Sequence, residues 1–482
     1  MNRHLTASLL ALATAAAPTP ALAQDAKTQL AASIDARRAD YVAIANQIWS
    51  LAEVGYQEHA SSKLLQAELT KAGFKVDAGV AGIPTAFVAS YGSGKPVIAL
   101  LAEFDALPGL SQAAEPERRA LVEHAPGHAC GHHLFGTASV AAGIAVKDWL
   151  ARTGGKGTIR VYGTPAEEGG GGKIYMVRAG LFSDVDVALD WHPGSVNDAG
   201  PGTSLANISG KFRFRGISAH AAGSPWSGRS ALDAVEAMDH MVNMMREHVP
   251  DGTRIHYVIT SGGSAPNVVP DFAEVYYYAR HKDAKIVKEV WERFEKAAQG
   301  AALGTGTKME VEVVNGVYAL LPNESLARAI DANLRRVGGV TYTPEERRFA
   351  DRLATTLLGD RVDVVAEAAR VVPFAQSDAG GSTDVGDVSW VVPNSGLSTA
   401  TWVPGTPAHS WQAVAAGGMS IGHKGMINAA KTLAMSVQDL MTKPELVAAA
   451  RAEFDRKRGA GFVYAPLIGD RKPPLDYRGP AK

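Results

Sequence analysis

Cysteine, net charge and long apolar runs are all scarce in this 482-residue sequence. Cys130 is the single cysteine, so the chain cannot form an internal disulfide. The formal net charge is −1 without a basic stripe, which gives no indication of nucleic-acid binding. Beyond the N-terminal segment, we see no apolar run of the roughly 18 residues that a membrane span requires. The composition, 46% hydrophobic and 20% charged, is that of an ordinary globular protein, and the length predicts two or three domains.

The first residues predict an export signal. A short basic start, residues 1–4, precedes an apolar run, residues 5–17, that is too short to cross a bilayer. Ala-Leu-Ala at 21–23 has the pattern of a cleavage site. A buried N-terminal helix is the alternative, but two prolines lie just before the cleavage site. We therefore expect residues 1–23 to be removed and the mature protein to be exported to the periplasm, in soluble form.

The residues around the cysteine predict a metal site. Residues 128–133 read His-Ala-Cys-Gly-His-His and precede an apolar small-residue run, 134–146, that is typical of a helix. Thiolate and imidazole are ligands that a zinc-like ion prefers, and Cys130 and His132 can turn toward one centre. A lone cysteine is more often a small buried apolar residue. The adjacent histidines favour ligation, which would also protect the thiol in an oxidising compartment.

Polar residues follow several strand-like runs in the first part of the chain. They are Asp105, the adjacent pair Glu167 and Glu168, and His192. Ligand sites of open α/β sheets lie at the carboxyl ends of the strands. Adjacent side chains on extended backbone point opposite ways, so one glutamate can face a metal and the other a metal-bound water. Taken singly, Asp105 is compatible with a turn cap and the glutamates with a solvated acidic turn, but the repetition favours a site.

The pattern of predicted elements changes near residue 207. From there the order is strand, helix, strand, strand, helix, strand, which is that of a ferredoxin-like α+β unit. We therefore expect an α/β domain with a parallel sheet, made of residues 24–206 and 319–482, and an inserted unit of residues 207–318. Polar residues at strand ends of the unit are His220, Asn267 and Arg280, although a lone histidine is more often structural. His409 lies in a later loop.

Six short motifs along the chain carry a likeness to a known family. They are Asp-Ala-Leu-Pro at 105–108, His-Ala-Cys-Gly-His at 128–132, Pro-Ala-Glu-Glu-Gly-Gly-Gly-Gly at 165–172, Ala-His-Ala-Ala at 219–222, Gly-Arg-Ser-Ala-Leu-Asp-Ala at 228–234 and Pro-Ala-His at 407–409. In this order they resemble the M20 family of metallopeptidases and aminoacylases, in its cysteine-containing amidohydrolase branch. The resemblance implies a catalytic domain with an inserted lid that also dimerises, and hence a homodimer.

The resemblance also implies a site for two divalent metal ions, zinc or manganese. Its ligands would be Cys130 as the bridge, with His132, Glu168, His192 and His409. Glu167 would be the general base that passes a proton from the metal-bound water to the leaving amine. Asp105 would orient a ligand. His220 would polarise the scissile carbonyl, often in the partner's site, and Asn267 and Arg280 would hold the free carboxylate of the substrate.

The implied activity is hydrolysis of the amide bond of an N-acyl or N-aroyl amino acid, with p-aminobenzoyl-glutamate as the first substrate to test. Two positions depart from the family pattern: His133 replaces the usual Asp or Asn, and Trp226 stands where many relatives carry His. An exported dipeptidase or carboxypeptidase is the alternative enzyme, and a periplasmic binding protein the alternative class. Glu167 argues against mere binding, which needs no base. The sequence leaves open whether a second type of hydrolase subunit takes part.

Overall fold

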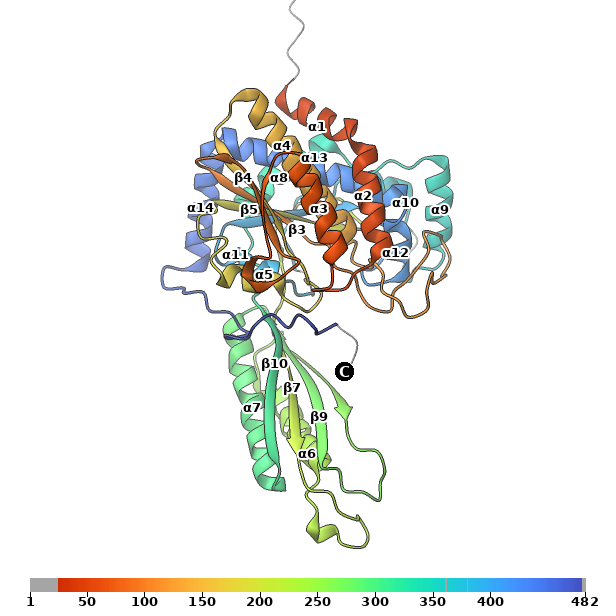
Figure 1. The fold of residues 1–482 in the computed structure, drawn as a ribbon, viewed down its shortest axis with the longest axis vertical. Helices are drawn as coiled ribbons and strands as arrows, with labels where there is room; N and C mark the ends of the chain where they lie inside the picture. Colours follow the sequence, from red (N-terminus) through yellow and green to blue (C-terminus); the bar gives the residue numbers. More distant parts are fainter. Residues whose placement is uncertain (1–24, 360–361, 379, 479–482) are drawn as a thin grey trace, which may run out of the picture.

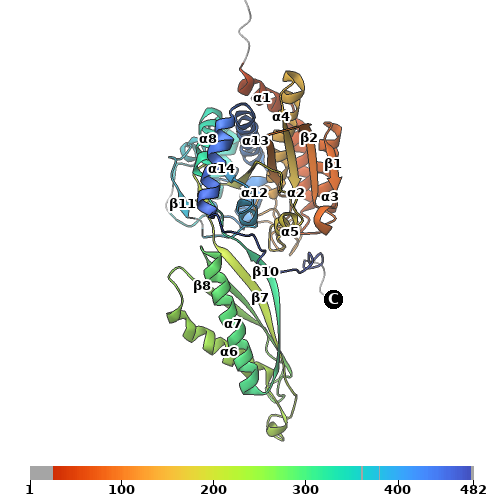
Figure 2. The same ribbon diagram turned by 90° about the vertical axis from the view of Figure 1, so that its left-hand side faces the viewer.

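The computed structural model describes residues 25–359, 362–378 and 380–478 and shows a molecule of two parts (Figure 1). One part is a sheet covered by helices, here called the α/β body. The other is a narrower unit, here called the insert, that extends away from the body in both views (Figures 1 and 2). The predicted export signal, residues 1–23, lies outside the described residues.

The α/β body is built on a six-stranded sheet of order β1-β2-β4-β3-β5-β12. Its strands are β1 (Lys75–Ala78), β2 (Phe87–Ser93), β3 (Val97–Ala102), β4 (Gly157–Gly163), β5 (Val187–Gly194) and β12 (Asn394–Ala400). Strands β3, β4, β5 and β12 are parallel, and β1 and β2 form an antiparallel edge. Every residue of β3 is buried, as expected for a parallel strand covered on both faces. The carboxyl ends of the parallel strands therefore meet at one edge.

Helices cover both faces of this sheet. One face carries α1 (Ala26–Ala36), α2 (Arg38–Leu51), α3 (His59–Lys71), α4 (His132–Thr153), α8 (Glu324–Val337), α13 (Ser420–Thr442) and α14 (Pro444–Arg458). The other face carries the short helices α5 (Gly172–Arg178) and α11 (Val385–Ser389). Helices α9 (Pro344–Ala354), α10 (Val364–Ala369) and α12 (Trp411–Gly417) contribute side chains to a separate apolar cluster. The predicted α/β class is confirmed.

Helix α4 is longer than the sequence pattern predicted. It includes His132 and His133 and runs to Thr153, so that it is long and apolar enough to cross a membrane. However, 83% of its most apolar window is buried inside the protein, which identifies it as a core helix. It begins after Gly131, which has a φ of 78°. A Cβ added at this position would come within 2.7 Å of the Pro193 side chain. Both the positive φ and the close contact require glycine. This tight entry brings the start of α4 against the end of β5.

The insert has the element order that the sequence predicted. Its elements are β7 (Ala206–Arg215), α6 (Ala231–Met245), β8 (Arg254–Ser261), β9 (Phe272–His281), α7 (Ala284–Thr305) and β10 (Lys308–Val317). The strands form an antiparallel sheet of order β10-β7-β9-β8, against which α6 and α7 pack. Helix α6 begins where the Ser230 side chain accepts a hydrogen bond from the Asp233 backbone N–H. The ferredoxin-like α+β unit is therefore confirmed.

The long strands of the insert carry its outer loops far from the body. In the register of β7 and β9, Ala206 pairs with His281 at the body end, and Arg215 pairs with Phe272 at the outer end. A ten-residue strand spans roughly 30 Å at about 3.3 Å per residue. The loops of residues 216–230 and 262–271 therefore form the tip of the insert, at the bottom of Figure 1.

Candidate metal centre

The five residues that the resemblance implied as metal ligands converge at the carboxyl edge of the parallel sheet. They form two groups that share Cys130, and in each group the ligand atoms lie within 4.8 Å of one another. The first, here the His132 group, is Cys130, His132 and His192; the second, here the His409 group, is Cys130, Glu168 and His409. Two three-residue groups with a common thiol are what two neighbouring ions with one bridging ligand require.

Local backbone geometry brings the members of the two groups together. The Cys130 Sγ lies 3.3 Å from His192 Nε2 at the end of β5, and His409 Nε2 lies 3.2 Å from Glu168 Oε1. The His409 backbone N–H donates to the carbonyl of Ala129 at 3.0 Å, which ties the His409 loop to the turn before α4. His409 itself has a positive φ of 59°. Such strain in a non-glycine residue is often concentrated at functional sites.

Three buried polar atoms at this centre, His132 Nε2, Glu168 Oε1 and Glu103 Oε2, make no well-aligned hydrogen bond to the described residues. Their neighbours are other ligand-type atoms: His132 Nε2 lies 3.1 Å from Glu103 Oε2, and Glu168 Oε1 lies 3.2 Å from His409 Nε2. Leaving a buried polar atom unpaired costs about 1–3 kcal/mol, so such atoms are rare in folded proteins. A divalent cation would satisfy the ring nitrogen and the carboxylate oxygens. Thiolate, imidazole and carboxylate together are ligands for zinc and for manganese. The residues present therefore fit two divalent ions.

Asp105 holds one of these ligands in position. Its Oδ1 lies 2.9 Å from His132 Nδ1, and its Oδ2 accepts a hydrogen bond from the Glu168 backbone N–H at 2.9 Å. A carboxylate that accepts a hydrogen bond from Nδ1 leaves Nε2 free as a metal ligand. Both side chains are fully buried, so the ring cannot rotate freely. Asp105 is thus placed to fix the tautomer and the orientation of His132.

Burial and neighbouring charges shift the proton affinities of the site in different directions. Burial raises the pKa of Glu167 well above its usual range, and the carboxylates of Glu103 and Glu168 act in the same direction. Burial acts most strongly, to raise the pKa of Glu168, but the side chains of His409 and His132 together outweigh it and the net pKa is lowered. Burial lowers the pKa of His192 to about 4, so its ring is neutral at neutral pH. The adjacent glutamates are therefore suited to different tasks.

Sequence reasoning missed a buried cation beside these carboxylates. The Nζ of Lys173, at the start of α5, lies 2.6 Å from Glu103 Oε1 and 2.7 Å from Asp384 Oδ1. The second oxygen of Glu103 lies 3.1 Å from His132 Nε2. A run of four glycines places Lys173 here, and Glu103 precedes Asp105 by two positions on the same strand end. That alternation was the available signal for Glu103, because residues two apart on a strand share a face, but no pattern pointed to Lys173.

The C-terminal segment is a second feature that the sequence did not reveal. It passes between the body and the insert (Figure 1), and its last described residues reach the metal centre. Tyr477 Oη and Arg478 Nη2 both donate hydrogen bonds to the backbone carbonyl of Glu168, each at 3.0 Å. No apolar period marks this proline-containing segment, so no sequence pattern predicted where it would lie.

The structure separates the three residues predicted in the insert. Arg280 lies at the body end of β9, where its Nη1 is 3.2 Å from Ser382 Oγ. His220 and Asn267 lie together at the tip, where the Ala221 N–H donates to the Asn267 carbonyl. The roughly 30 Å length of the strands lies between the two ends. Within one chain, therefore, Asn267 and Arg280 do not meet at one carboxylate, and His220 does not reach the metal centre.

The two positions that depart from the family pattern lie outside the ligand groups. His133 is fully buried, its Nε2 lies 3.1 Å from the carbonyl of Gly417, and its ring packs against His128 with centroids 4.9 Å apart. Trp226 is 74% exposed at the tip of the insert. His133 therefore packs in the core behind the centre, and Trp226 is remote from it in this chain.

The fold and the two ligand groups define a metal-dependent hydrolase with an inserted dimerisation unit. Residues 206–305 match the family described as the M20 peptidase dimerisation domain. Over 463 residues the chain is 43% identical to one of the subunits of the p-aminobenzoyl-glutamate hydrolase of Escherichia coli (strain K12), covering 90% of this chain and 96% of that protein. The chain therefore belongs to the M20 peptidase family, as its motifs predicted, and is one of the amidohydrolases of that family.

Two further proteins show the breadth of this family. The Xaa-Arg dipeptidase of Mus musculus is 30% identical over 448 residues, covering 89% of this chain and 92% of that protein. A Bacillus subtilis protein described as a dinuclear metal binding peptidase from the M20 family has a solved structure with a TM-score of 0.58. At 17% identity, with 85% of this chain and 99% of that chain covered, this likeness shows the fold alone.

Proposed function

We propose that this chain hydrolyses the amide bond of N-acyl or N-aroyl amino acids, with p-aminobenzoyl-glutamate as the lead substrate. The observation that carries the proposal is the pair of ligand groups sharing Cys130, with Glu167 adjacent to the ligand Glu168. The Escherichia coli relative, named for p-aminobenzoyl-glutamate, supplies the lead substrate. A binding protein would have no use for a general base beside a full set of metal ligands.

The residues divide the chemistry among themselves. The His132 group would hold one divalent ion and the His409 group the other, and such a pair supplies an activated water and polarises the scissile carbonyl. Glu167 takes a proton from the attacking water and passes it to the leaving amine nitrogen. Asp105 keeps the His132 ring in the ligating orientation, and Lys173 offsets the negative charge of Glu103.

We propose a homodimer formed through the insert. Strand β8 lies at the edge of the insert sheet, and three large side chains there, Tyr257, Val258 and Ile259, are 38%, 56% and 40% exposed. A partner's tip could then deliver its own His220 and Asn267 to the body of this chain, on the side where Arg280 lies beside Ser382. This arrangement would account for the separation of these residues within one chain. Because the Escherichia coli relative is named as one subunit of its hydrolase, a second type of subunit is the alternative partner.

We also propose that the two ions are zinc or manganese and that the protein is exported. The donor set suits both ions, so metal analysis of the purified protein decides between them. N-terminal sequencing of protein recovered from a periplasmic extract should begin at Gln24. A chain that retains residue 1, or that remains entirely in the cytoplasm, would contradict export.

The deciding experiment is amine release by the purified mature protein supplied with Zn²⁺ or Mn²⁺. The panel comprises p-aminobenzoyl-glutamate, other N-acyl amino acids and unblocked dipeptides. Hydrolysis confined to N-blocked substrates with a free carboxylate supports the proposal. Preference for dipeptides with a free amino terminus would instead support a dipeptidase, the activity named for the Mus musculus relative. Failure to hydrolyse any member, in protein shown to hold metal, would favour a binding role.

A further inference from the structure

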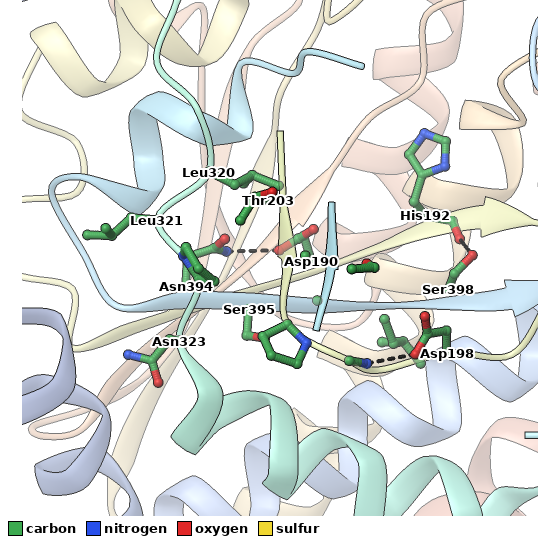
Figure 3. Close-up of a pocket in the computed structure, with 17 residues that line it drawn as sticks. Asp190, His192, Asp198, Thr203, Leu320, Leu321, Asn323, Asn394, Ser395 and Ser398 are labelled. Atoms are coloured by element: carbon green, nitrogen blue, oxygen red, sulfur yellow. Dashed lines mark hydrogen bonds between the residues drawn. The ribbon is translucent and has the colours of Figure 1, made fainter. Parts of the chain in front are cut away.

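A cavity borders the metal centre at His192, and its other lining residues lie outside the ligand groups (Figure 3). Its volume is about 290 Å³, near the lower end of the 300–1,000 Å³ typical of small-molecule sites. Strands β5 and β12 form one wall, and the connections between the body and the insert, at Thr203 and Leu320, form another. His192 stands at its edge. A group entering the cavity would therefore lie next to the metal centre.

The charged residues of this cavity are of one sign. The described residues that line it include two acidic ones, Asp190 and Asp198, and no Lys or Arg. The Oδ1 of Asp198 accepts a hydrogen bond from the Gly200 backbone N–H at 2.8 Å. A free carboxylate of a substrate would meet two carboxyl groups here, with no Lys or Arg side chain in the described lining to pair with it. The carboxylate-bearing half of the substrate is therefore better placed elsewhere, toward Arg280, which leaves the cavity for the acyl half.

Asp190 offers a hydrogen-bond acceptor in the wall of the cavity. Its Oδ1 accepts from Asn394 Nδ2 at 2.8 Å (Figure 3), and its carboxylate also accepts from its own backbone N–H, which leaves lone pairs of Oδ2 for a ligand. Gly396 lies opposite on β12, where a Cβ would come within 2.5 Å of that Oδ2. Only glycine at this position leaves room for the carboxylate. Apolar side chains such as Leu320, Leu321 and Leu397 form other parts of the wall and suit the body of an acyl group.

We propose that this cavity is the acyl-side subsite and that it selects acyl groups that carry an amino group, which donates a hydrogen bond to Asp190. The inference rests on the proposed amide hydrolysis and specifies its substrate class. The aryl amine of a p-aminobenzoyl group and the ammonium of an aminoacyl group share the required donor. A hydrogen bond to a charged partner is worth roughly a ten- to hundredfold preference in kcat/KM.

The test compares pairs of substrates that differ only in the amino group. One pair is p-aminobenzoyl-glutamate and benzoyl-glutamate, and the other is β-alanyl-glutamate and propionyl-glutamate. The readout is the ratio of kcat/KM within a pair, measured for the metal-loaded wild type, for Asp190→Asn and for Asp198→Asn. Asp190→Asn keeps an oxygen for Asn394 but turns a donor toward the cavity. Asp198→Asn removes the same charge from another part of the wall and is the matched control.

The proposal expects a ratio of about ten or more in the wild type, a ratio near one in Asp190→Asn, and the wild-type ratio in Asp198→Asn. The pair with the larger ratio tells whether the aryl amine or the aliphatic ammonium is preferred. The proposal would be overturned if the kcat/KM ratio of the wild type were near one in both pairs, or if Asp190→Asn kept the wild-type ratio. Either result would count against it even if every substrate is hydrolysed.

A binding measurement separates failure of this inference from failure of the proposed activity. The neutral probes 4-aminobenzamide and benzamide are titrated into the metal-loaded wild type and Asp190→Asn by calorimetry. Tighter binding of 4-aminobenzamide to the wild type, lost in Asp190→Asn, supports the subsite even if no amide is cleaved. Equal binding of the two probes to the wild type contradicts it.

Discussion

The hydroxyl of Tyr477 donates a hydrogen bond to the backbone carbonyl of Glu168 at 3.0 Å, across 309 residues of sequence. Arg478 donates to the same oxygen, and the Tyr477 ring meets Tyr56 edge to face with centroids 5.6 Å apart. The turn so held includes Ala166, whose φ of 58° is strained for a residue other than glycine. Strain of this kind costs about 1–3 kcal/mol and persists only where the surroundings enforce it. The end of the chain thus helps to fix the turn that carries Glu167 and Glu168.

Replacing Tyr477 with Phe should therefore loosen this turn without unfolding the protein. Loss of one hydrogen bond is worth about 1 kcal/mol, so we expect kcat to fall by roughly two- to tenfold and metal affinity to fall with it. The double variant Tyr477→Phe with Arg478→Ala should lose more than either single variant. Tyr91→Phe is the matched control, because Tyr91 pairs with Ile159 toward the opposite end of β4. Wild-type kcat and metal affinity in the double variant would show that the segment does not position the turn.

The adjacent glutamates should fail in different ways. Glu167→Gln removes the proton acceptor but no ligand, so we expect metal content and melting temperature to be kept and turnover to fall about a hundredfold or more. Glu168→Gln removes an oxygen of the His409 group and should lower the metal content as well. Elemental analysis and kcat on the same preparations separate the two. Near-normal turnover in Glu167→Gln would reject its role as the base.

Cys130 should control the binding of both ions, since it belongs to both ligand groups. Cys130→Ser replaces a thiolate with a weaker ligand, so we expect a lower metal stoichiometry at equal free metal. Because the chain has a single cysteine, a thiol reagent reports on this position alone. In the wild type the reagent should react faster after chelation of the metal than before. Unchanged stoichiometry in Cys130→Ser would remove the thiol from the ligand set.

The sequence predicted those features that depend on local patterns. Strand ends identified Asp105, Glu167 and His192, because parallel strands deliver their carboxyl ends to one edge. The order of elements identified the insert. Patterns along the chain could not predict that Lys173 lies against Glu103, because that contact joins the start of a helix to a different strand end. Nor could they show that Tyr477 reaches Glu168, since a contact across the whole chain depends on how all the intervening elements pack.

Lys173 should be important for stability as well as for the charge balance of the site. Its side chain is 0% exposed and pairs with Glu103 and Asp384. Removing one partner from a buried ion pair leaves uncompensated charge and typically costs about 3–5 kcal/mol. Lys173→Met should therefore lower the free energy of unfolding by about that amount in chemical denaturation. Lys285→Met, which breaks an exposed pair with Glu289 on α7, should change it by less than about 1 kcal/mol.

An effect of less than about 1 kcal/mol for Lys173→Met would show that the neighbouring carboxylates are neutralised by protonation instead. The double variant Lys173→Met with Glu103→Gln provides a second check. It removes both charges of one pair, so it should be more stable than Lys173→Met alone.

Acid should destabilise the fold through His423, which lies in α13. Burial lowers the pKa of His423 to about 4, and its Nε2 lies 2.8 Å from Asn46 Oδ1. In the unfolded chain the His423 ring becomes protonated as the pH falls below its usual pKa of about 6.5, whereas in the folded protein it stays neutral to a lower pH. The stabilisation is therefore complete above about pH 6.5 and is lost as the pH falls toward 4, by up to about 3 kcal/mol. His423→Gln keeps a donor for Asn46 but does not titrate, so its free energy of unfolding should fall less steeply between pH 7 and pH 5. The control is His59→Gln, at an exposed position, whose free energy of unfolding should change with pH as that of the wild type does, at equal metal content. If the free energy of unfolding of His423→Gln also fell with pH in parallel with the wild type, His423 would not be the source of the acid sensitivity.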